Sequence, residues 1–507
     1  MPFYGHWLTY TARFLNSSHG YYFLEINDYK NELKLGNQII ISLSNKLYPA
    51  KLSIQNHKKG AYVLISKDLL EDFDLKKYFK VQINYLNDMF HSKVTQHNLV
   101  IPKRLVSKEH FKRDDIVYLS AYSLTGDTIY FKNLISKVVK NSKENKFILN
   151  VPTKYGIEEA VFKLNPAQIP QLSSPLDDIL NGLNLAKFGN DKIVFFYGKN
   201  KKPAFIYENG VLNNEIIYYL GAYFADGAKK GYKWLINASS PEQAKFYFKM
   251  HHSLIYNPNI DCYVRLTVKN YITDKEVLGY WHDNSDLVVS KVSRLPSKSD
   301  RIPPNYLKYG SLVMREHNAS IHTFYIKLIN YIIDNEIIKK NSKRNALDFI
   351  LGFLEGDGFV APKSSSGEIG LAVSKSEVGI MEKILKVTGL NYWVSNKNTN
   401  GPSIFVYSRD ILTNLPYIYM DLFKFYPKRR YKFIERLTDS PMSEFILGKR
   451  TKIANWIKGY LKNKNLILDN GNLTTSGEHI REILLHLIKE NSKYNNDLRP
   501  SPEPIFS

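Results

Sequence analysis

Two apolar segments, 131 residues apart, share one pattern that limits how this chain can fold. The first reads EIIYYLGAYFADGAKKG and the second reads LDFILGFLEGDGFVAPK. Each predicts a helix with small residues four positions apart, Gly221 and Ala225 in the first and Gly352 and Gly356 in the second. Because small residues at this spacing clear one face of a helix, two such helices can pack almost backbone to backbone.

Both segments end in Asp-Gly, a dipeptide that occurs nowhere else in the sequence. A glycine just past a helix commonly supplies a left-handed C-cap, and we expect that conformation at Gly227 and Gly358. An aspartate at a helix C-terminus faces the negative end of the helix dipole, so helix stability alone disfavours it. If the two helices pack face to face, the two carboxylates meet, and a divalent cation between them relieves their repulsion. Oxygen ligands suit Mg²⁺ or another divalent ion such as Mn²⁺, so the expected metal ligands are Asp226, Asp357, Ala225 and Gly356.

The segments that follow the two motifs also repeat. After the first motif, YKWLINAS predicts a strand, and Ser240 followed by Pro241 predicts a helix start. After the second, FVAPKSSSGEIGLAVS predicts a hairpin, with a helix opening near Ser374 or Ser376. Later, SLVMREHNASIHTF matches SIFVYSRDILTNLP as strand then helix. We therefore expect an internal duplication with helices on one face of each sheet and a polar opposite face that suits a DNA groove.

The motif pair resembles the LAGLIDADG homing endonucleases, in their single-chain form with two motif copies. YLGAYFADG and ILGFLEGDG carry the resemblance, which spans about 235 residues. It implies an α+β fold with a duplicated LAGLIDADG (αββαββα-type) core and curved antiparallel sheets. It also implies that Asp226 and Asp357 bind Mg²⁺ and cut both DNA strands across the minor groove, leaving short 3′ overhangs.

The resemblance further implies a basic residue near the metal site in each repeat. Lys375, in LAVSKSE, matches that place and is the third expected catalytic residue, with Asp226 and Asp357. The first copy reads INASSPEQ there and has no lysine in register, which leaves uneven strand cleavage or nicking open. Glu355 precedes the second aspartate by two residues, but the first copy has Phe224 there, so we assign Glu355 no catalytic role.

The expected function is therefore a site-specific, Mg²⁺-dependent endonuclease for double-stranded DNA with a long target site, acting as a monomer. The alternative is a DNA-binding regulator or an intron-RNA maturase that uses the same fold without cleavage. Both aspartates favour the enzyme, because binding alone does not need two carboxylates at helix ends.

The excess of basic over acidic residues is consistent with a polyanionic partner. A coding sequence that is biased towards lysine codons would give the same excess. The 507 residues include 70 Lys and Arg against 48 Asp and Glu, a formal net charge of +22. Phosphate contacts are expected from basic residues near the motifs: Lys229, Lys230, Lys233, Lys298, Arg301, Lys363, Lys428, Arg429 and Arg430.

Cysteine content and hydropathy exclude other classes of protein. The single cysteine, Cys262, excludes an internal disulfide framework and a zinc site built on several thiolates. No apolar run approaches the length of a membrane span, and the N-terminus lacks the pattern of a secretory signal. We expect an intracellular, DNA-associated protein of the cytoplasm, or of an organellar matrix if organelle-encoded.

Composition divides the chain into a β-rich N-terminal domain (1–165), a proline-containing linker (166–204), two motif repeats (205–330 and 331–440) and a helical module (441–507). In the first domain, AYVLISKDLLEDFDLKKYFKVQI aligns with HNLVIPKRLVSKEHFKRDDIVYLS at an offset of 36, each reading as strand, basic helical turn, strand. These units are similar to swapped-hairpin DNA-binding regulators, and a β-barrel repeat without DNA binding is the alternative. The last module resembles the end of a winged helix, with a helical cap as the alternative.

Overall fold

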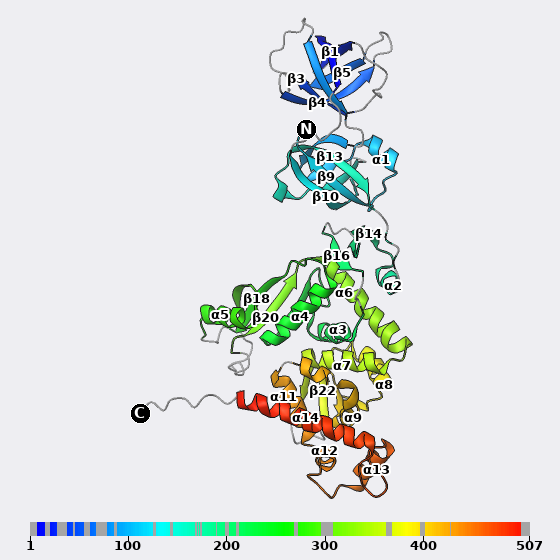
Figure 1. Ribbon diagram of the computed structural model, residues 1–507, viewed down its shortest axis with the longest axis vertical. Helices are drawn as coiled ribbons and strands as arrows, with labels where there is room; N and C mark the ends of the chain where they lie inside the picture. Colours follow the sequence, from blue (N-terminus) through cyan, green and yellow to red (C-terminus); the bar gives the residue numbers. More distant parts are fainter. Residues whose placement is uncertain are drawn as a thin grey trace, which may run out of the picture. The chain divides into compact units, whose positions relative to one another are not determined.

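The computed structural model has an α+β architecture in which curved antiparallel sheets combine with helices (Figure 1). It forms two compact units, residues 1–171 with 183–190 and 194–203, and residues 172–182 with 191–193 and 204–507. The structure describes residues 8–15, 21–27, 38–43, 46–54, 61–66, 79–85, 89–124, 128–141, 146–167, 170, 172, 175–188, 190–197, 202–208, 212–267, 272–295, 308–360, 368–395, 401–425 and 427–497.

A closed barrel forms the first part of the N-terminal unit. Its six strands follow the order β1-β2-β5-β4-β3-β6, and every pair within it is antiparallel. Closure leaves no strand edge unpaired. The strands are β1 (Leu8–Leu15), β2 (Tyr21–Asn27), β3 (Gln38–Leu43), β4 (Lys46–Ile54), β5 (Ala61–Ser66) and β6 (Phe79–Tyr85).

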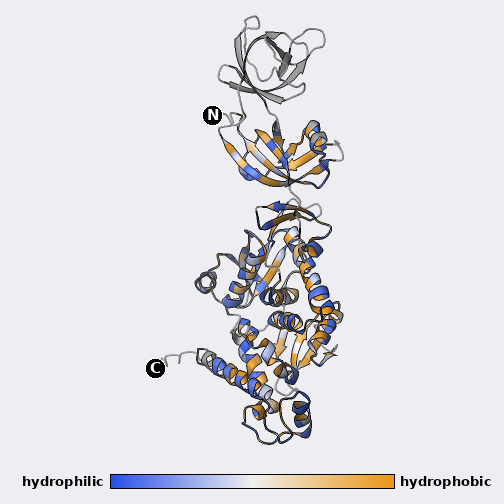
Figure 2. Ribbon diagram, turned by 45° about the vertical axis from the view of Figure 1, so that its right-hand side comes forward, coloured by the Kyte–Doolittle hydropathy of each residue, from blue (hydrophilic) through white to orange (hydrophobic). Residues whose placement is uncertain are grey.

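A seven-stranded sheet, in the order β10-β9-β13-β7-β8-β12-β11, follows the barrel in sequence. Hydrophobic and hydrophilic residues alternate along its strands in Figure 2, and Phe90, Leu119 and Phe162 are fully buried in its core. The elements are β7 (Met89–Thr95), β8 (Asn98–Val100), α1 (Lys103–Glu109), β9 (Ile116–Tyr122), β10 (Ile129–Lys137), β11 (Val139–Asn141), β12 (Lys146–Asn150) and β13 (Glu159–Pro166).

The predicted strand–turn–strand repeat is present in the second copy as β8, α1 and β9. In the first copy, β5 and β6 match the two strands, and the predicted helical turn between them lies outside the described residues. A further copy consists of β12, a 3-10 turn at Thr153–Tyr155, and β13. Pro102 is the N-cap of α1, and its carbonyl accepts a hydrogen bond from the backbone N–H of Val106 at 3.2 Å.

The segment 166–204, which we expected to be a linker, contains regular structure. It holds α2 (Leu176–Leu180), β14 (Asn184–Phe188) and β15 (Lys192–Phe196), and a three-stranded sheet continues into β16 (Ala204–Tyr207). Pro166 ends β13 and Pro175 directly precedes α2, so composition identified these breaks and missed the short apolar strand KIVFF.

The first motif opens one half of the larger unit. Its four-stranded sheet has the order β17-β20-β18-β19, in which only the β18–β19 pair is parallel. As predicted, Ser240 caps α4, accepting a hydrogen bond from the backbone N–H of Gln243 at 3.2 Å. The elements are α3 (Asn214–Asp226), β17 (Trp234–Ala238), α4 (Pro241–Leu254), β18 (Asp261–Thr267), α5 (Asp274–Ser285), β19 (Val289–Leu295), β20 (Ser311–Glu316) and α6 (Ala319–Tyr331), the last continued by a π-helical segment, Ile332–Lys339.

The second motif opens a second half whose sheet has the order β21-β22-β24-β23. Its β22-β24-β23 core repeats the β17-β20-β18 core of the first half, with a helix after the first and middle strands of each. The α8 helix begins differently from our expectation, because Glu377 rather than a serine precedes it. The elements are α7 (Lys343–Asp357), β21 (Gly358–Val360), β22 (Glu368–Ala372), α8 (Val378–Thr388), β23 (Tyr392–Ser395), β24 (Ser403–Tyr407) and α9 (Ser408–Thr413).

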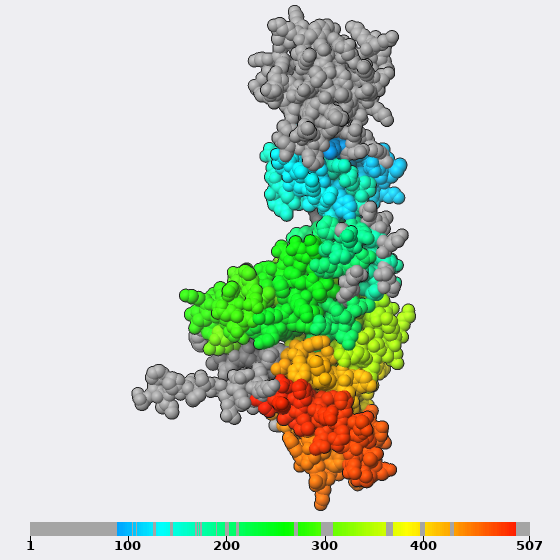
Figure 3. Space-filling view, in the orientation of Figure 1, coloured from blue at the N-terminus to red at the C-terminus, as the bar shows by residue number. Residues whose placement is uncertain are grey.

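Helices dominate the rest of the larger unit, with α14 in red lying against the orange segments of α11 and α12 (Figure 3). Between α13 and α14 the chain makes a short hairpin-like turn, closed by a bridge between Ile467 and Leu473 around Asn470–Gly471. None of the helices in the described part of the chain combines the length and hydrophobicity of a membrane span. The helices are α10 (Leu415–Ile418), a 3-10 turn (Asp421–Lys424), α11 (Pro427–Thr438), α12 (Pro441–Ile446), α13 (Asn455–Asn463) and α14 (Thr475–Asp497).

A buried acid in α7 gives the larger unit a pH-dependent stability. Asp348 is 0% exposed and lies 3.0 Å from Arg344, which also pairs with Asp421. The pKa of Asp348 is raised to about 7, chiefly by burial and then by the neighbouring Asp421, while Arg344 opposes the shift. A raised carboxyl pKa means that the native state holds a proton that the unfolded chain has released.

We therefore expect the free energy of unfolding to fall as pH rises from about 4 to about 8, by about 1–4 kcal/mol through Asp348. Asp348→Asn should flatten this pH dependence, because the amide has no proton to lose. Urea unfolding of both proteins at several pH values measures the slope. Equal slopes would show that Asp348 does not titrate in this range.

Candidate active site

The two motif helices, α3 and α7, meet at their small residues. A Cβ built on Gly221 would lie 2.1 Å from the carbonyl oxygen of Phe349, and one built on Gly352 would lie 1.8 Å from that of Tyr218. Real Cβ atoms do not approach oxygen this closely, so the two backbones touch at both glycines. This is the contact that the four-residue spacing of small residues predicted.

The glycines that follow the helices do not adopt the left-handed conformation that we expected. Gly227 has φ −77° and ψ 159°, and Gly358 has φ −84° and ψ 151°, so both are extended. Glycine is required for another reason: a Cβ would lie 2.3 Å from the carbonyl oxygen of Tyr223 or of Leu354, respectively. After α7 the backbone enters the sheet at once, because β21 begins at Gly358 itself. After α3 the backbone N–H of Ala228 donates to the carbonyl of Leu235 in β17 at 2.9 Å.

The two aspartates end their helices on the same side of this contact. A Cβ built on Gly356 would lie 2.5 Å from the Cβ of Ala225 and 3.0 Å from Oδ2 of Asp226. The Asp226 carboxylate therefore lies against the residue that precedes Asp357. Asp357 in turn lines a pocket of about 580 Å³, so the structure brings the predicted acids to one place beside an open volume.

The donor set at this place fits a hard divalent cation that shares its ligands with a substrate. Within the described residues, no group of three or more His, Cys, Asp or Glu side chains could hold a metal ion. Two carboxylates remain, with the last carbonyls of α3 and α7, including those of Ala225 and Gly356. Mg²⁺ is commonly held by one or two carboxylates, several waters and substrate phosphate, which matches this set.

An ion pair between the two halves forms one wall of the pocket. Lys229, from the loop after α3, donates a short hydrogen bond to Oε1 of Glu377, and its ammonium lies 5.1 Å from the ring centroid of Phe224. Glu377 Oε2 accepts from the backbone N–H of Ser374 at 2.8 Å. Burial alone would raise the pKa of Glu377, but the hydrogen bonds from Lys229 and Ser374 lower it below its usual value. Glu377 is therefore a carboxylate that is already neutralised by Lys229.

We expect Lys229→Met to lower the free energy of unfolding by about 1–2 kcal/mol at pH 7, because it leaves the buried Glu377 carboxylate without its cation. Adding Glu377→Gln should restore about half or more of that loss. Because the pKa of Glu377 is lowered, this stabilisation is present at neutral pH and disappears as pH falls below 4.5. Urea titrations of both single variants and the double variant at pH 7 and pH 3.5 measure it, and additive losses would exclude the coupling.

Other predicted catalytic positions lie close by. Lys375 is exposed in the turn between Ser374 and Glu377, beside rather than among the residues that line the pocket. Lys229, which we assigned to DNA contacts, is the basic residue that lines it. Glu355 is buried, and its Oε1 accepts from Nε2 of Gln243 at 2.9 Å, so a second hydrogen bond joins the two halves.

The remaining predicted basic contacts lie partly within the described residues and partly outside them. Lys230 is exposed and Lys233 is half-buried, both in the loop between α3 and β17. Arg430 lies in α11 with its guanidinium 5.4 Å from the ring centroid of Phe423. Lys428 and Arg429 belong to α11, but their side chains lie outside the described set, and the positions outside the described residues altogether are Lys298, Arg301 and Lys363.

The partnership of Lys229 with Glu377 could not be predicted from the sequence. The pattern Ser374-x-x-Glu377 is that of a capping box, which signals a helix start and gives the glutamate a local hydrogen bond. Its cationic partner is 148 residues away, and no local pattern in the sequence connects the two.

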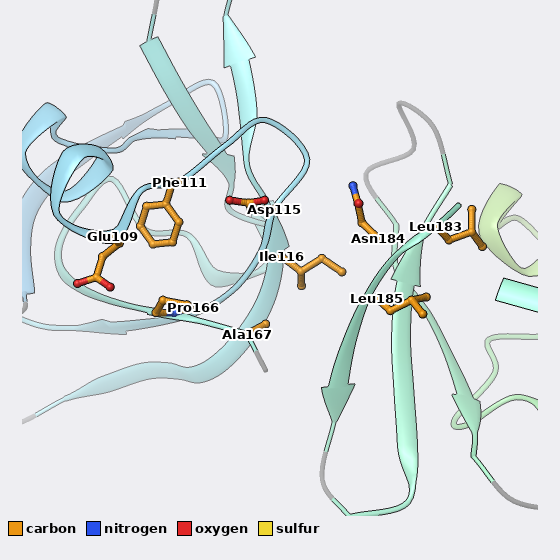
Figure 4. Close-up of a pocket in the computed structure, with 9 residues that line it drawn as sticks. All are labelled: Glu109, Phe111, Asp115, Ile116, Pro166, Ala167, Leu183, Asn184 and Leu185. Atoms are coloured by element: carbon orange, nitrogen blue, oxygen red, sulfur yellow. The ribbon is translucent and has the colours of Figure 1, made fainter. Parts of the chain in front are cut away.

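A second pocket, of about 370 Å³, belongs to the N-terminal unit and contains none of the predicted site residues. Figure 4 shows Phe111 and Ile116 on one side and Leu183 and Leu185 on the other. Asn184 Nδ2 donates to the backbone carbonyl of Asp114 at 3.0 Å, which holds β14 at this wall. The lining is mixed and brings together no set of catalytic groups.

Comparisons with known proteins give no family for this chain. No protein-family model matches it, and no curated protein matches it. Among solved structures, the full-length DUF199/WhiA protein from Thermatoga maritima matches with a TM-score of 0.26 and 12% sequence identity. The match covers 56% of this chain and 93% of that one.

Proposed function

We propose that this protein is a Mg²⁺-dependent, site-specific endonuclease for double-stranded DNA, with an active site at the ends of α3 and α7. The observation that carries the proposal is the placement of two aspartates at the C-termini of two helices in backbone contact. Helix stability disfavours a carboxylate at each of these positions, and packing brings the two helix ends together. Two carboxylates at close range repel each other, and a divalent cation between them would relieve that repulsion.

Each residue has a role in this proposal. Asp226 and Asp357, with the carbonyls of Ala225 and Gly356, hold the divalent cation, which when bound activates water and stabilises the leaving oxygen. Lys229 lines the pocket beside Asp357 and attracts the scissile phosphate. Glu377 fixes the ammonium of Lys229 in position, and the exposed Lys230 and Lys375 hold the flanking phosphates.

The test is incubation of the full chain with a randomised duplex DNA library, with and without Mg²⁺. We expect cleavage only with the metal, at a restricted set of sequences, with short 3′ overhangs in the sequenced products. Binding of duplex DNA without metal-dependent cleavage would overturn the endonuclease and leave the DNA-binding regulator. Selective binding of RNA under the same conditions would favour the maturase.

A further inference from the structure

The outward face of the second sheet carries a row of aromatic rings. Residues alternate between the faces of a strand, and Ile369, Leu371 and Ile404 bury one face of this sheet. On the other face, the register aligns Phe359 with Gly370, Gly370 with Phe405, and Phe405 with Trp393. This cross-strand line, Phe359–Gly370–Phe405–Trp393, is the aromatic row.

The rings of the aromatic row form a continuous surface. Phe405 stacks with Trp393 at 4.4 Å between centroids and meets the edge of Phe359 at 5.7 Å. A Cβ on Gly370 would lie 2.2 Å from the Phe359 ring, so the glycine allows that ring to lie over the strand. Phe359 is 39% exposed and Trp393 is 38% exposed, which leaves part of both rings uncovered.

The aromatic row adjoins the candidate active site and is flanked by cations. Phe359 lines the same pocket as Asp357 and Lys229, and the outward-facing Ala372 and Ser403 line it as well. Beyond the end of β24, the guanidinium of Arg409 in α9 lies 4.5 Å from the ring centroid of Tyr407 and 5.7 Å from that of Trp456 in α13. Exposed rings next to cations suit a polyanion whose flat groups can stack on the rings. Nucleic acid with unstacked bases has both properties, because its phosphates are anionic and its bases are flat.

The first sheet presents a different surface. Where the second sheet has Gly370, Phe405 and Trp393, the register of the first sheet places Asn237, Val313 and Tyr263. Two residues along the same face, Arg315 forms two hydrogen bonds with Oδ2 of Asp261, at 2.9 and 2.6 Å, and its guanidinium lies 4.8 Å from the ring centroid of Tyr263. Hydrogen-bonding groups of this kind suit the edges of paired bases in a groove. An aromatic row cannot reach the faces of bases that remain stacked in a duplex.

We propose that the second half binds DNA whose bases are unstacked, with at least one base lying against the aromatic row beside Asp357. The proposal rests on the proposed function and specifies its substrate: the target carries unpaired bases on the second-half side of the cut. The pocket of about 580 Å³ between the row and Asp357 gives the unstacked nucleotide its place.

Fluorescence anisotropy with a single-stranded DNA of about 20 nucleotides tests the proposal, with the fully paired duplex of the same sequence alongside. We expect Trp393→Leu and Phe405→Leu to weaken single-strand binding about 5- to 100-fold, the range for loss of one base–aromatic stack. Binding of the paired duplex should change by less than about two-fold, and Trp393→Phe should keep single-strand binding within about three-fold of the unaltered protein. Thermal melting of each variant separates lost binding from lost folding.

Tyr417→Leu is the matched control, because Tyr417 is 51% exposed in α10 and contacts Lys343, at the end of α7 away from Asp357. It should leave both affinities unchanged. Equal loss of duplex and single-strand binding in Trp393→Leu, or no loss of either, would overturn the proposal. A change in oligomeric state in the Trp393 variants would also overturn it by showing that another copy covers the row. Metal-dependent cleavage of paired DNA is measured separately, so the proposed function can stand or fail independently.

Discussion

Asp226→Asn and Asp357→Asn are each expected to lower the rate of Mg²⁺-dependent DNA cleavage by more than about 100-fold. Asparagine keeps the shape of aspartate but removes the charge that binds the cation. The same variants should be slightly more stable, by about 0.3–1 kcal/mol, because a negative charge leaves the C-terminal end of a helix dipole. Plasmid cleavage under single-turnover conditions and urea unfolding of the metal-free protein measure the two effects.

Opposite changes in activity and stability distinguish a catalytic role from a structural one. If an aspartate had only a structural role, its substitution would lower both the cleavage rate and the stability. Equal cleavage by the variants and the unaltered protein would contradict the site assignment. Asp283→Asn is the control, because its carboxylate in α5 is 77% exposed. It should change neither cleavage nor stability measurably.

Gly352→Ala is expected to destabilise the larger unit by about 3 kcal/mol or more, or to prevent its folding. The added Cβ would lie 1.8 Å from the carbonyl oxygen of Tyr218 and 3.0 Å from the backbone nitrogen of Ala222. Backbone atoms cannot rotate aside as a side chain can, so α3 and α7 must separate along their contact. Any folded fraction should also lose cleavage, because the separation moves Asp226 away from Asp357.

Gly279→Ala provides the control for the loss of a helical glycine. Gly279 lies in the middle of α5, and a Cβ there meets no described atom within 4 Å. This variant should be more stable by about 0.5–1 kcal/mol, since alanine is the better helix former. Urea unfolding of both variants checks the contrast, and a Gly352→Ala protein as stable as Gly279→Ala would show that the helices are not in backbone contact.

Much of the larger unit could be predicted because local patterns carry its information. A cap or an alternation of residues within about ten positions was enough to predict three features. These are the start of α4 after Ser240, the strand WLINA, and the strand-then-helix pairs that begin at Ser311 and Ser403. Long-range features had no such signal. Gly227 is extended although its place after a helix predicted a left-handed conformation, and Glu377, which precedes α8, pairs with a lysine from the other half.

The sequence alone determined that two glycine-bearing helices would pack at their small residues, because a missing Cβ is a property of the residue and its spacing is local. It also indicated that an aspartate at the C-terminus of each helix lowers the stability of that helix, because its charge faces the negative end of the helix dipole. Only the tertiary structure decided what surrounds them. Lys229 reaches Glu377 across 148 residues, and Phe359, Phe405 and Trp393 become one surface through the register of three separate strands. Such pairings depend on how strands align, and sequence spacing does not fix that alignment.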